Sequence, residues 1–192
     1  MKHHNGSQSS KPVVAGNKQS KPRARAEHSC CKITANEVAI FGGWADRPLN
    51  DLWSFNFVDM EWRVLVSSGI QPRPRYRHSA EFIGNNLYIL GGSDNNEDIP
   101  EQSRNLGIHV LSLSTMQWSH PPLSGGFNPF PRSGHGSTVI GVTTIAIFGG
   151  KYNNQVFSNS IAISFLDSLK FGDVVISRFS STIWSYWMSK LW

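Results

Sequence analysis

Ile40-Phe41-Gly42-Gly43 is one of three short apolar runs that end in a pair of glycines. The other two are Leu87-Tyr88-Ile89-Leu90-Gly91-Gly92 and Ile145-Ala146-Ile147-Phe148-Gly149-Gly150. We interpret each run as a buried strand that the glycines stop, because its exit needs a backbone conformation that glycine adopts at low cost. Three copies at a spacing of roughly fifty residues indicate a repeat protein.

Other landmarks recur with the double glycine. Each copy has an arginine three residues before a histidine, and these pairs are Arg25 and His28, Arg75 and His78, and Arg132 and His135. A tryptophan closes the first two copies, 19 positions after Gly43 and 26 positions after Gly92. The extra residues of the second copy fall within 93–105, a polar and acidic stretch. Loops absorb insertions and strands do not, so we expect a surface loop there.

Between these landmarks the apolar pattern is that of short strands separated by Gly, Asn, Asp and Pro turns. We expect four strands in each repeat. In the first repeat they are placed at 29–34, 38–41, 52–57 and 62–66. No helical periodicity appears before residue 180. The sequence therefore predicts an all-β chain.

The net charge of +5 belongs to the N-terminal segment. Residues 1–26 hold six lysines and arginines and no acid, whereas residues 27–192 hold 12 bases and 13 acids. Because the body of the chain is nearly neutral, we expect no nucleic-acid partner. Residues 1–24 are expected to form a disordered basic tail. Its basic run at 18–25 is either a solubilising leader or a patch for nuclear import or for an anionic partner.

The two cysteines, Cys30 and Cys31, are adjacent and cannot staple the fold. No N-terminal apolar segment resembles a signal peptide. The longest apolar stretch, 139–148, is too short to span a membrane. We therefore expect a cytoplasmic protein, and the basic run leaves nuclear import open.

The combined pattern resembles the kelch repeat. The resemblance is carried by the Arg-x-x-His element, the apolar run into Gly-Gly, the Asn50-Asp51-Leu52-Trp53 stretch and the trailing tryptophan. It covers about residues 22–171 and implies that each repeat is one four-stranded antiparallel blade of a β-propeller. The repeats are placed at 25–74, 75–131 and 132–171, with Phe171 at the tryptophan position of the third.

Only three copies are recognisable, whereas propellers have four to eight blades. Three blades would leave two open faces, so we expect a partial propeller that a second copy closes, or else a truncated product. The divergent tail at 172–192 carries Trp184, Trp187, Met188 and Leu191 at helical spacing. We expect a short C-terminal helix that covers an open face, with a non-homologous tail or an interfacial membrane anchor as alternatives.

Chemistry-bearing motifs are missing from the sequence. There is no phosphate-binding loop, nucleophile elbow or zinc-protease motif. The recurring histidines come one per blade, so we interpret them as structural, with the arginines and histidines bonding to neighbouring backbone. The acidic residues between 94 and 101 do not match a calcium loop. We therefore expect no enzyme activity, cofactor or metal.

The resemblance also implies a partner-binding surface. In kelch proteins, partner contacts often come from the residues just after the double glycine and from the two between Arg and His. In this chain they are Trp44, Tyr76, Arg77, Ser93, Asp94, Ser133, Gly134, Lys151 and Tyr152. For Trp44, packing on the next blade is an equal alternative. The prediction is a non-enzymatic protein–protein interaction module, a scaffold or adaptor. The alternative is a fragment of a metal-dependent kelch-type propeller enzyme.

Overall fold

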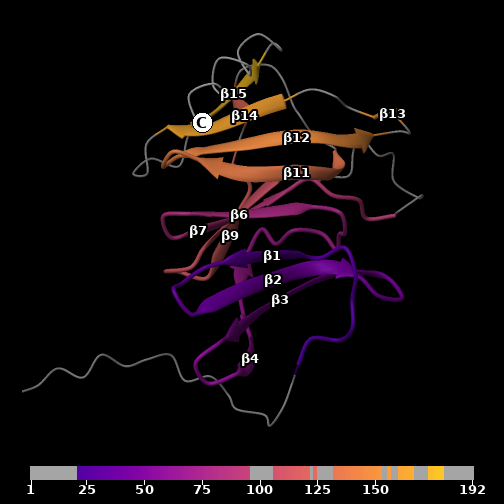
Figure 1. Ribbon diagram of the computed structural model, residues 1–192, viewed down its shortest axis with the longest axis vertical. Helices are drawn as coiled ribbons and strands as arrows, with labels where there is room; N and C mark the ends of the chain where they lie inside the picture. The colour runs from indigo at the N-terminus through magenta and orange to yellow at the C-terminus, as the bar shows by residue number, and fades with distance from the viewer. Residues whose placement is uncertain are drawn as a thin grey trace, which may run out of the picture.

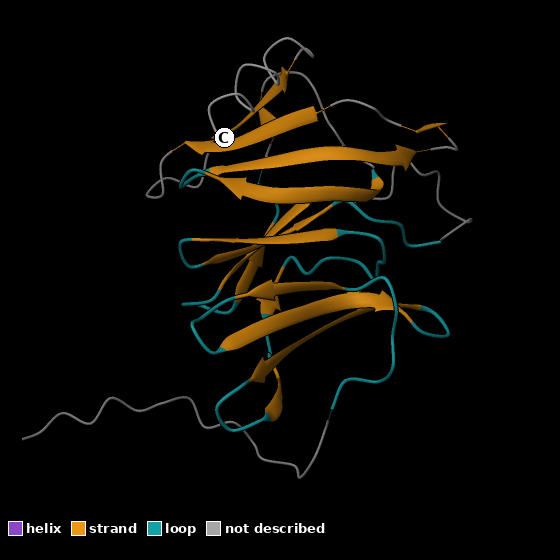
Figure 2. Ribbon diagram, viewed as in Figure 1, coloured by secondary structure: helices purple, strands orange, loops and turns teal. Residues whose placement is uncertain are grey.

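The chain forms three β-sheets stacked face to face along its longest dimension (Figure 1, Figure 2). The computed structural model describes residues 21–95, 106–121, 123–124, 132–152, 155–156, 160–166 and 173–179. All regular structure in these ranges is β. The all-β architecture of kelch-type blades is therefore confirmed. The predicted C-terminal helix and most of the basic tail lie outside the described residues.

The first sheet has the four antiparallel strands that the pattern predicts, in chain order from one edge to the other. They are β1 (Ser29–Lys32), β2 (Glu37–Trp44), β3 (Pro48–Asn56) and β4 (Glu61–Val64). Both cysteines lie on β1 and both are free thiols. Neighbouring strands are joined by short turns, as a meander with local pairing requires.

The second and third sheets each gain a two-residue strand from the preceding linker, paired parallel at the outer edge. The second sheet contains β5 (Ser68–Gly69), β6 (Ser79–Ile83), β7 (Asn86–Leu90), β8 (Ile108–Ser112) and β9 (Gln117–Ser119). The third contains β10 (Leu123–Ser124), β11 (Ser133–Ile140), β12 (Thr144–Tyr152), β13 (Gln155–Val156), β14 (Ser160–Leu166) and β15 (Asp173–Phe179). These linker strands tie each blade to the one before it.

The third sheet continues beyond residue 171, where the sequence pattern fades, because β15 supplies its fourth antiparallel strand. The register shows which residue takes the tryptophan position. Phe55 pairs with Trp62 in the first blade, and Leu111 pairs with Trp118 in the second. Counting from each double glycine, the equivalent pair in the third blade is Ile163 with Ile176. Ile176 therefore takes the tryptophan position of the third repeat, which the repeat spacing had assigned to Phe171. Phe171 itself lies outside the described residues.

The double glycines do not stop the strand in the first and third repeats, so that prediction was wrong there. Strands β2 and β12 run through the pair, and the pairing of β2 with β3 shifts by one residue between Phe41 and Gly43. Only β7 ends at Leu90, just before its glycines. Both glycines of the first pair have positive φ, 58° at Gly42 and 100° at Gly43. The pair forms a β-bulge that lets the strand continue past the neighbouring chain.

Apolar side chains from both sheets fill the junction between the first and second blades. Between the first and second sheets, Phe41 packs its ring against Trp118, with centroids 5.6 Å apart. The buried cluster at this junction is Ile33, Ala39, Phe41, Leu52, Leu87, Ile89, Leu111 and Trp118. The inner strands β1, β6 and β11 lie against one another in that order. A lone blade could not bury both faces, so this packing between blades is the core of the molecule.

Recurring arginines and histidines hold the inner ends of the blades. Arg25, Arg75 and Arg132 each donate to the carbonyl of the first glycine in their own blade, at 3.0, 2.9 and 2.7 Å. The predicted backbone role of the arginines is thus confirmed. The histidines reach across the junctions to serine hydroxyls. His78 Nε2 lies 2.8 Å from Ser29 Oγ, and His135 Nε2 lies 2.9 Å from Ser79 Oγ.

Candidate protein-binding surface

The two groups of residues that the sequence predicts as partner contacts are paired in every blade. The residue after the arginine lies opposite the residue after the double glycine. Ala26 pairs with Trp44, Tyr76 with Ser93, and Ser133 with Lys151. In the first two blades each pair exchanges two backbone hydrogen bonds of 2.8–2.9 Å. The prediction from the two sequence groups therefore describes one rim at one end of the blades.

An aromatic step crosses this rim from the first blade to the second. The rings of Trp44 and Tyr76 meet edge to face, with centroids 5.1 Å apart. The Arg77 guanidinium carbon lies 5.5 Å from the Tyr76 ring centroid, a cation–π distance. Trp44 therefore packs on the next blade and is also half-buried at the rim. The packing alternative for Trp44 is therefore confirmed, and its role as a partner contact stays a prediction.

Arg77 is fixed by an acidic residue that the sequence reasoning missed. Its Nε donates to Glu27 Oε1 at 2.8 Å, and a second guanidinium nitrogen lies at the same distance from that oxygen. Glu27 holds the position in the first repeat that Arg77 holds in the second. Counting the Arg-x-x-His element in the first repeat would have found it. Because both side chains are more than a third exposed, the ion pair orients Arg77 more than it stabilises the fold.

The three equivalent residues Glu27, Arg77 and Gly134 all adopt left-handed backbone conformations, with φ of 55°, 55° and 66°. They form a ladder across the blades. The Arg77 amide donates to the Glu27 carbonyl at 3.0 Å, and the Gly134 amide donates to the Arg77 carbonyl at 2.9 Å. Non-glycine residues rarely adopt this conformation, and such strain concentrates at functional sites. Here the ladder places the side chains of Glu27 and Arg77 in a row at the rim.

Buried charge underlies the exposed rim. Arg75 is fully buried, and burial lowers its pKa to about 9, although the nearby Asp94 carboxylate opposes that shift. Burial, followed by the charge of Arg75, lowers the pKa of His78 to about 3. The histidine is therefore neutral at physiological pH, because burial between two blades beside Arg75 disfavours the charged form. Arg75 and His78 are buried beneath the rim, so their side chains cannot contact a partner there.

The predicted contact residues divide by exposure. Arg77, Gly134 and Lys151 are exposed, and Trp44, Tyr76, Ser93 and Tyr152 are half-buried. Asp94 and Ser133 are buried, at 9% and 8% of their accessible surface. Asp94 lies beside Arg75, and the Ser133 hydroxyl donates to the Lys151 carbonyl at 3.5 Å. The sequence motif could not distinguish Asp94 and Ser133 from the other residues, because it gives the position of a residue in the repeat but not its burial.

Metal-binding and membrane-spanning features were sought in the same part of the chain. The described ranges contain no group of three or more His, Cys, Asp or Glu side chains placed to hold a metal ion. They also contain no apolar helix of the length that crosses a bilayer.

Sheets stacked by their faces, with an Arg-x-x-His element and a double glycine in each, define blades of a kelch-type β-propeller. A sequence comparison places the chain more closely. The family model of the KLHDC2/KLHL20/DRC7 Kelch-repeats domain matches residues 3–188. The chain belongs to this kelch-repeat family.

Relatives with very different names contain a similar segment. A probable serine/threonine-protein kinase of Dictyostelium discoideum is 33% identical over 150 residues, which are 75% of this chain and 11% of the relative. Acyl-CoA-binding domain-containing protein 5 of Arabidopsis thaliana is 32% identical over 160 residues, 79% of this chain and 23% of that protein. Human host cell factor 2 is 29% identical over 157 residues, 72% and 20% of the two chains. The chain thus spans less than a quarter of the length of these relatives.

Proposed function

We propose that this protein is a non-enzymatic kelch-repeat interaction module, a scaffold or adaptor that binds a protein segment on the rim formed by Trp44, Tyr76 and Arg77. The single observation that carries the proposal is the ordered side-chain row across two blades. Trp44 packs on Tyr76, and the Arg77 guanidinium lies over the same ring. Tryptophan, tyrosine and arginine are the residue types most enriched at binding hot spots.

The charges on the rim suggest the chemistry of the bound segment. Arg77 and Lys151 are exposed cations, and the Arg77 guanidinium already holds one carboxylate, that of Glu27. A partner carboxylate can replace Glu27 on the guanidinium, since both side chains are accessible to solvent. An apolar or aromatic neighbour in the same segment would pack on the exposed part of Trp44 and Tyr76. The proposed ligand is therefore an acidic peptide segment with an adjacent apolar side chain.

The relatives support a binding role over a catalytic one. The matched segment occurs in proteins named as a kinase, an acyl-CoA-binding protein and a host cell factor, and it makes up 11–23% of each. A segment common to such different proteins is more simply a shared interaction module than a shared catalyst. No observation in the described residues favours the alternative of a metal-dependent enzyme fragment.

The test is selection of a random-peptide phage library on the full chain and on two variants. Arg77→Ala removes the guanidinium and its ion pair at the rim. Arg63→Ala is the matched control, because Arg63 lies on β4 and pairs with Asp59 at a distant surface. We expect acidic peptides to be enriched on the wild type and on Arg63→Ala. For the selected peptides, Arg77→Ala should raise Kd by at least about 30-fold, the loss typical of a hot spot.

Thermal unfolding of the same variants separates binding from folding. Arg77→Ala should unfold within a few degrees of Arg63→Ala, because an exposed ion pair contributes about 1 kcal/mol or less. Peptides that bind Arg77→Ala as well as the wild type would contradict the proposed site. A large loss of thermal stability in Arg77→Ala alone would assign the residue to packing instead.

A further inference from the structure

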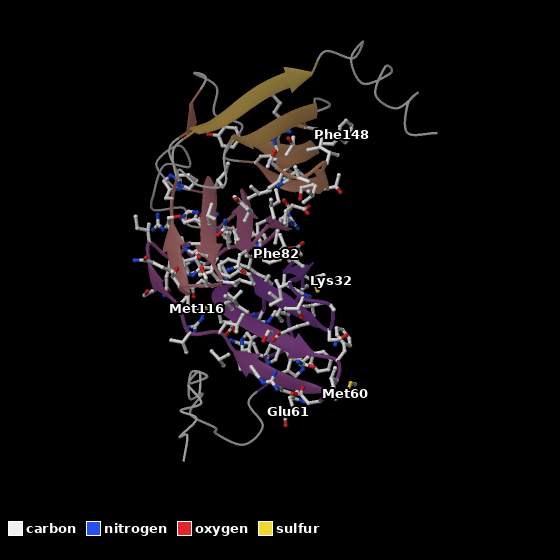
Figure 3. All side chains as sticks on the ribbon, turned by 90° about the vertical axis from the view of Figure 1, so that its left-hand side faces the viewer. Lys32, Met60, Glu61, Phe82, Met116 and Phe148 are labelled. Carbon is white, nitrogen blue, oxygen red and sulfur yellow. The ribbon has the colours of Figure 1, made fainter. Side chains whose placement is uncertain are left out.

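Strand β4 is the outer edge of the first blade, and among the described strands it pairs with β3 alone. Just after β4, the Leu65 amide donates to the Leu52 carbonyl, and antiparallel pairing alternates from residue to residue. The amide and carbonyl of Trp62 therefore point away from β3. Met60, which precedes this edge, is 67% exposed, and it lies with Glu61 at the end of the stack (Figure 3). Such an open edge is a template for another strand.

The outer edge of the second blade shows what this kind of edge accepts. There the Ser68 amide of β5 donates to the Met116 carbonyl at 3.0 Å, and the Ile70 amide donates to the Trp118 carbonyl at 3.1 Å. The Trp118 indole donates to Ser67 Oγ at 2.9 Å. In the third blade, β10 pairs with β15 in the same parallel sense. Each of these edges therefore binds a short parallel strand from the segment that precedes its blade.

Strand β4 presents the same groups as β9. Trp62 holds the register position of Trp118, and Met60 holds that of Met116. Both methionines adopt left-handed backbone conformations, with φ of 57° and 53°, so the two turns present their carbonyls alike. The Trp62 side chain is half-buried, and its indole corresponds to the donor that binds Ser67. The first blade therefore offers two carbonyl acceptors and one indole donor in the arrangement that binds β5.

A strand bound in this way needs a glycine opposite the tryptophan. Gly69 pairs with Trp118 at a φ of 85°, and a Cβ there would lie 2.4 Å from the Trp118 carbonyl oxygen. Only glycine permits so close an approach of two backbones. In the third repeat, Gly125 directly follows the paired residues of β10 in the sequence. The strand that fits the edge of β4 is therefore a short extended segment that ends in glycine.

We propose that this strand is the chain's own residues 13–16, Val-Val-Ala-Gly, which pair parallel to β4 with Gly16 opposite Trp62. They contain the only apolar run in residues 1–24, and β-branched valines favour extended strands. The family model begins to match at residue 3, so it includes this segment. The pairing would order part of a tail that composition alone predicts to be disordered. The inference is independent of the proposed peptide-binding function.

The described chain enters the first blade by the same local path as the second. Arg25 and Arg75 each donate from Nε to the carbonyl two residues earlier, both at 3.1 Å. Six positions separate Gly69 from Arg75, and nine separate Gly16 from Arg25. The first linker can therefore reach the equivalent edge with three residues to spare. Because the segment is tethered so closely, its effective concentration at the edge is on the order of millimolar.

The first experiment is hydrogen–deuterium exchange of the full chain, followed at single amides by NMR. The amides of Ala15 and Asn17 take the places of Ser68 and Ile70, which donate to the edge of β9. Gly16→Val should speed their exchange by about tenfold or more, because a side chain there would meet the Trp62 carbonyl and break the pairing. Gly6→Val is the matched control in the same tail and should leave both rates unchanged.

The second experiment joins the two strands covalently, in a chain whose native cysteines are both replaced by serine. Ala15→Cys and Glu61→Cys should become direct neighbours, as Ser68 and Gln117 are, which is within reach of a disulfide. Mild oxidation should then form a disulfide within one chain. Ser7→Cys with Glu61→Cys is the matched control and should oxidise far more slowly, because residue 7 lies outside the proposed strand.

Three results would overturn the proposal. The first is exchange at Ala15 and Asn17 that is as fast in the wild type as in Gly16→Val. The second is a pair of cysteines at 15 and 61 that oxidises no faster than the pair at 7 and 61. The third is a disulfide that joins two chains and not one, which would assign the edge of β4 to a second copy.

Discussion

At the scale of single residues, the second glycine of each pair is required by the histidine of its own blade. A Cβ built at Gly43, Gly92 or Gly150 would come within 2.7–2.9 Å of the Cβ of His28, His78 or His135. The φ angles at these glycines are 100°, 106° and 87°. The double glycine is therefore a site of close approach between the bulged strand and the inner strand, as well as a backbone device.

Gly92→Ala should be strongly destabilising for this reason. Its Cβ would lie 2.9 Å from the His78 Cβ and 3.0 Å from the Tyr76 carbonyl oxygen, at a φ unfavourable for alanine. We expect a loss of about 2–4 kcal/mol in the free energy of unfolding, measured by urea denaturation. Gly84→Ala is the control. Gly84 also has a positive φ, but a Cβ added there would meet no heavy atom within 4 Å. Its cost should be about 1 kcal/mol, and equal losses for the two variants would contradict the close-approach argument.

At the scale of elements, the junction between blades combines apolar packing with a neutral histidine. His78 and His135 are both buried at the inner ends of the junctions, on the hydroxyls of Ser29 and Ser79. Burial, followed by the charge of the nearby arginine, lowers the pKa of His78 to about 3 and of His135 to about 4. The junctions therefore tolerate protonation poorly, and stability should depend on pH in the acid range.

The sign follows from the two states. In the unfolded chain both histidines titrate near 6.5, so below that pH the unfolded chain binds more protons than the folded one. Their contribution to stability is complete above pH 6.5 and is lost as pH falls toward 4. Each histidine should add a slope of about 1.4 kcal/mol per pH unit within this window. The measurement is urea denaturation of the wild type and His78→Gln at pH 7, 6, 5 and 4. The variant should show a smaller slope, and parallel curves would contradict a neutral buried His78.

The sequence was most informative where one residue type answers one geometric need. Repeated glycines, arginines and histidines located the blade cores, and the paired positions beside them located the rim. The repeat pattern did not predict strand β15. Ile176 of this strand stands where the first two blades have tryptophan, so the landmark that marks the fourth strand is missing from the third repeat. The linker strands β5 and β10 were also missed, since two residues carry no alternating pattern. Burial of Asp94 depends on Arg75, which is distant in sequence, so the repeat motif alone could not indicate it.

At the scale of the whole molecule, the recurring contacts give the stack a direction. The ladder of Glu27, Arg77 and Gly134 crosses both described junctions in the same direction, and at the first junction Phe41 also packs on Trp118 of the following blade. The same ladder gathers the rim residues at one end of the blades. The architecture therefore explains why residues from separate repeats form one surface, which is the surface proposed to bind a peptide segment.

Hydrogen–deuterium exchange of the full chain, with and without a peptide selected on it, tests this binding surface most directly. Exchange should slow at the backbone around Trp44, Tyr76, Arg77 and Ser93, which line the rim on two blades. The outer strand β4 is the internal control and should exchange at the same rate in both samples. Protection at the rim with β4 unchanged is the result that our account predicts. Protection centred on β4, or a rim that exchanges equally fast with bound peptide, would contradict it.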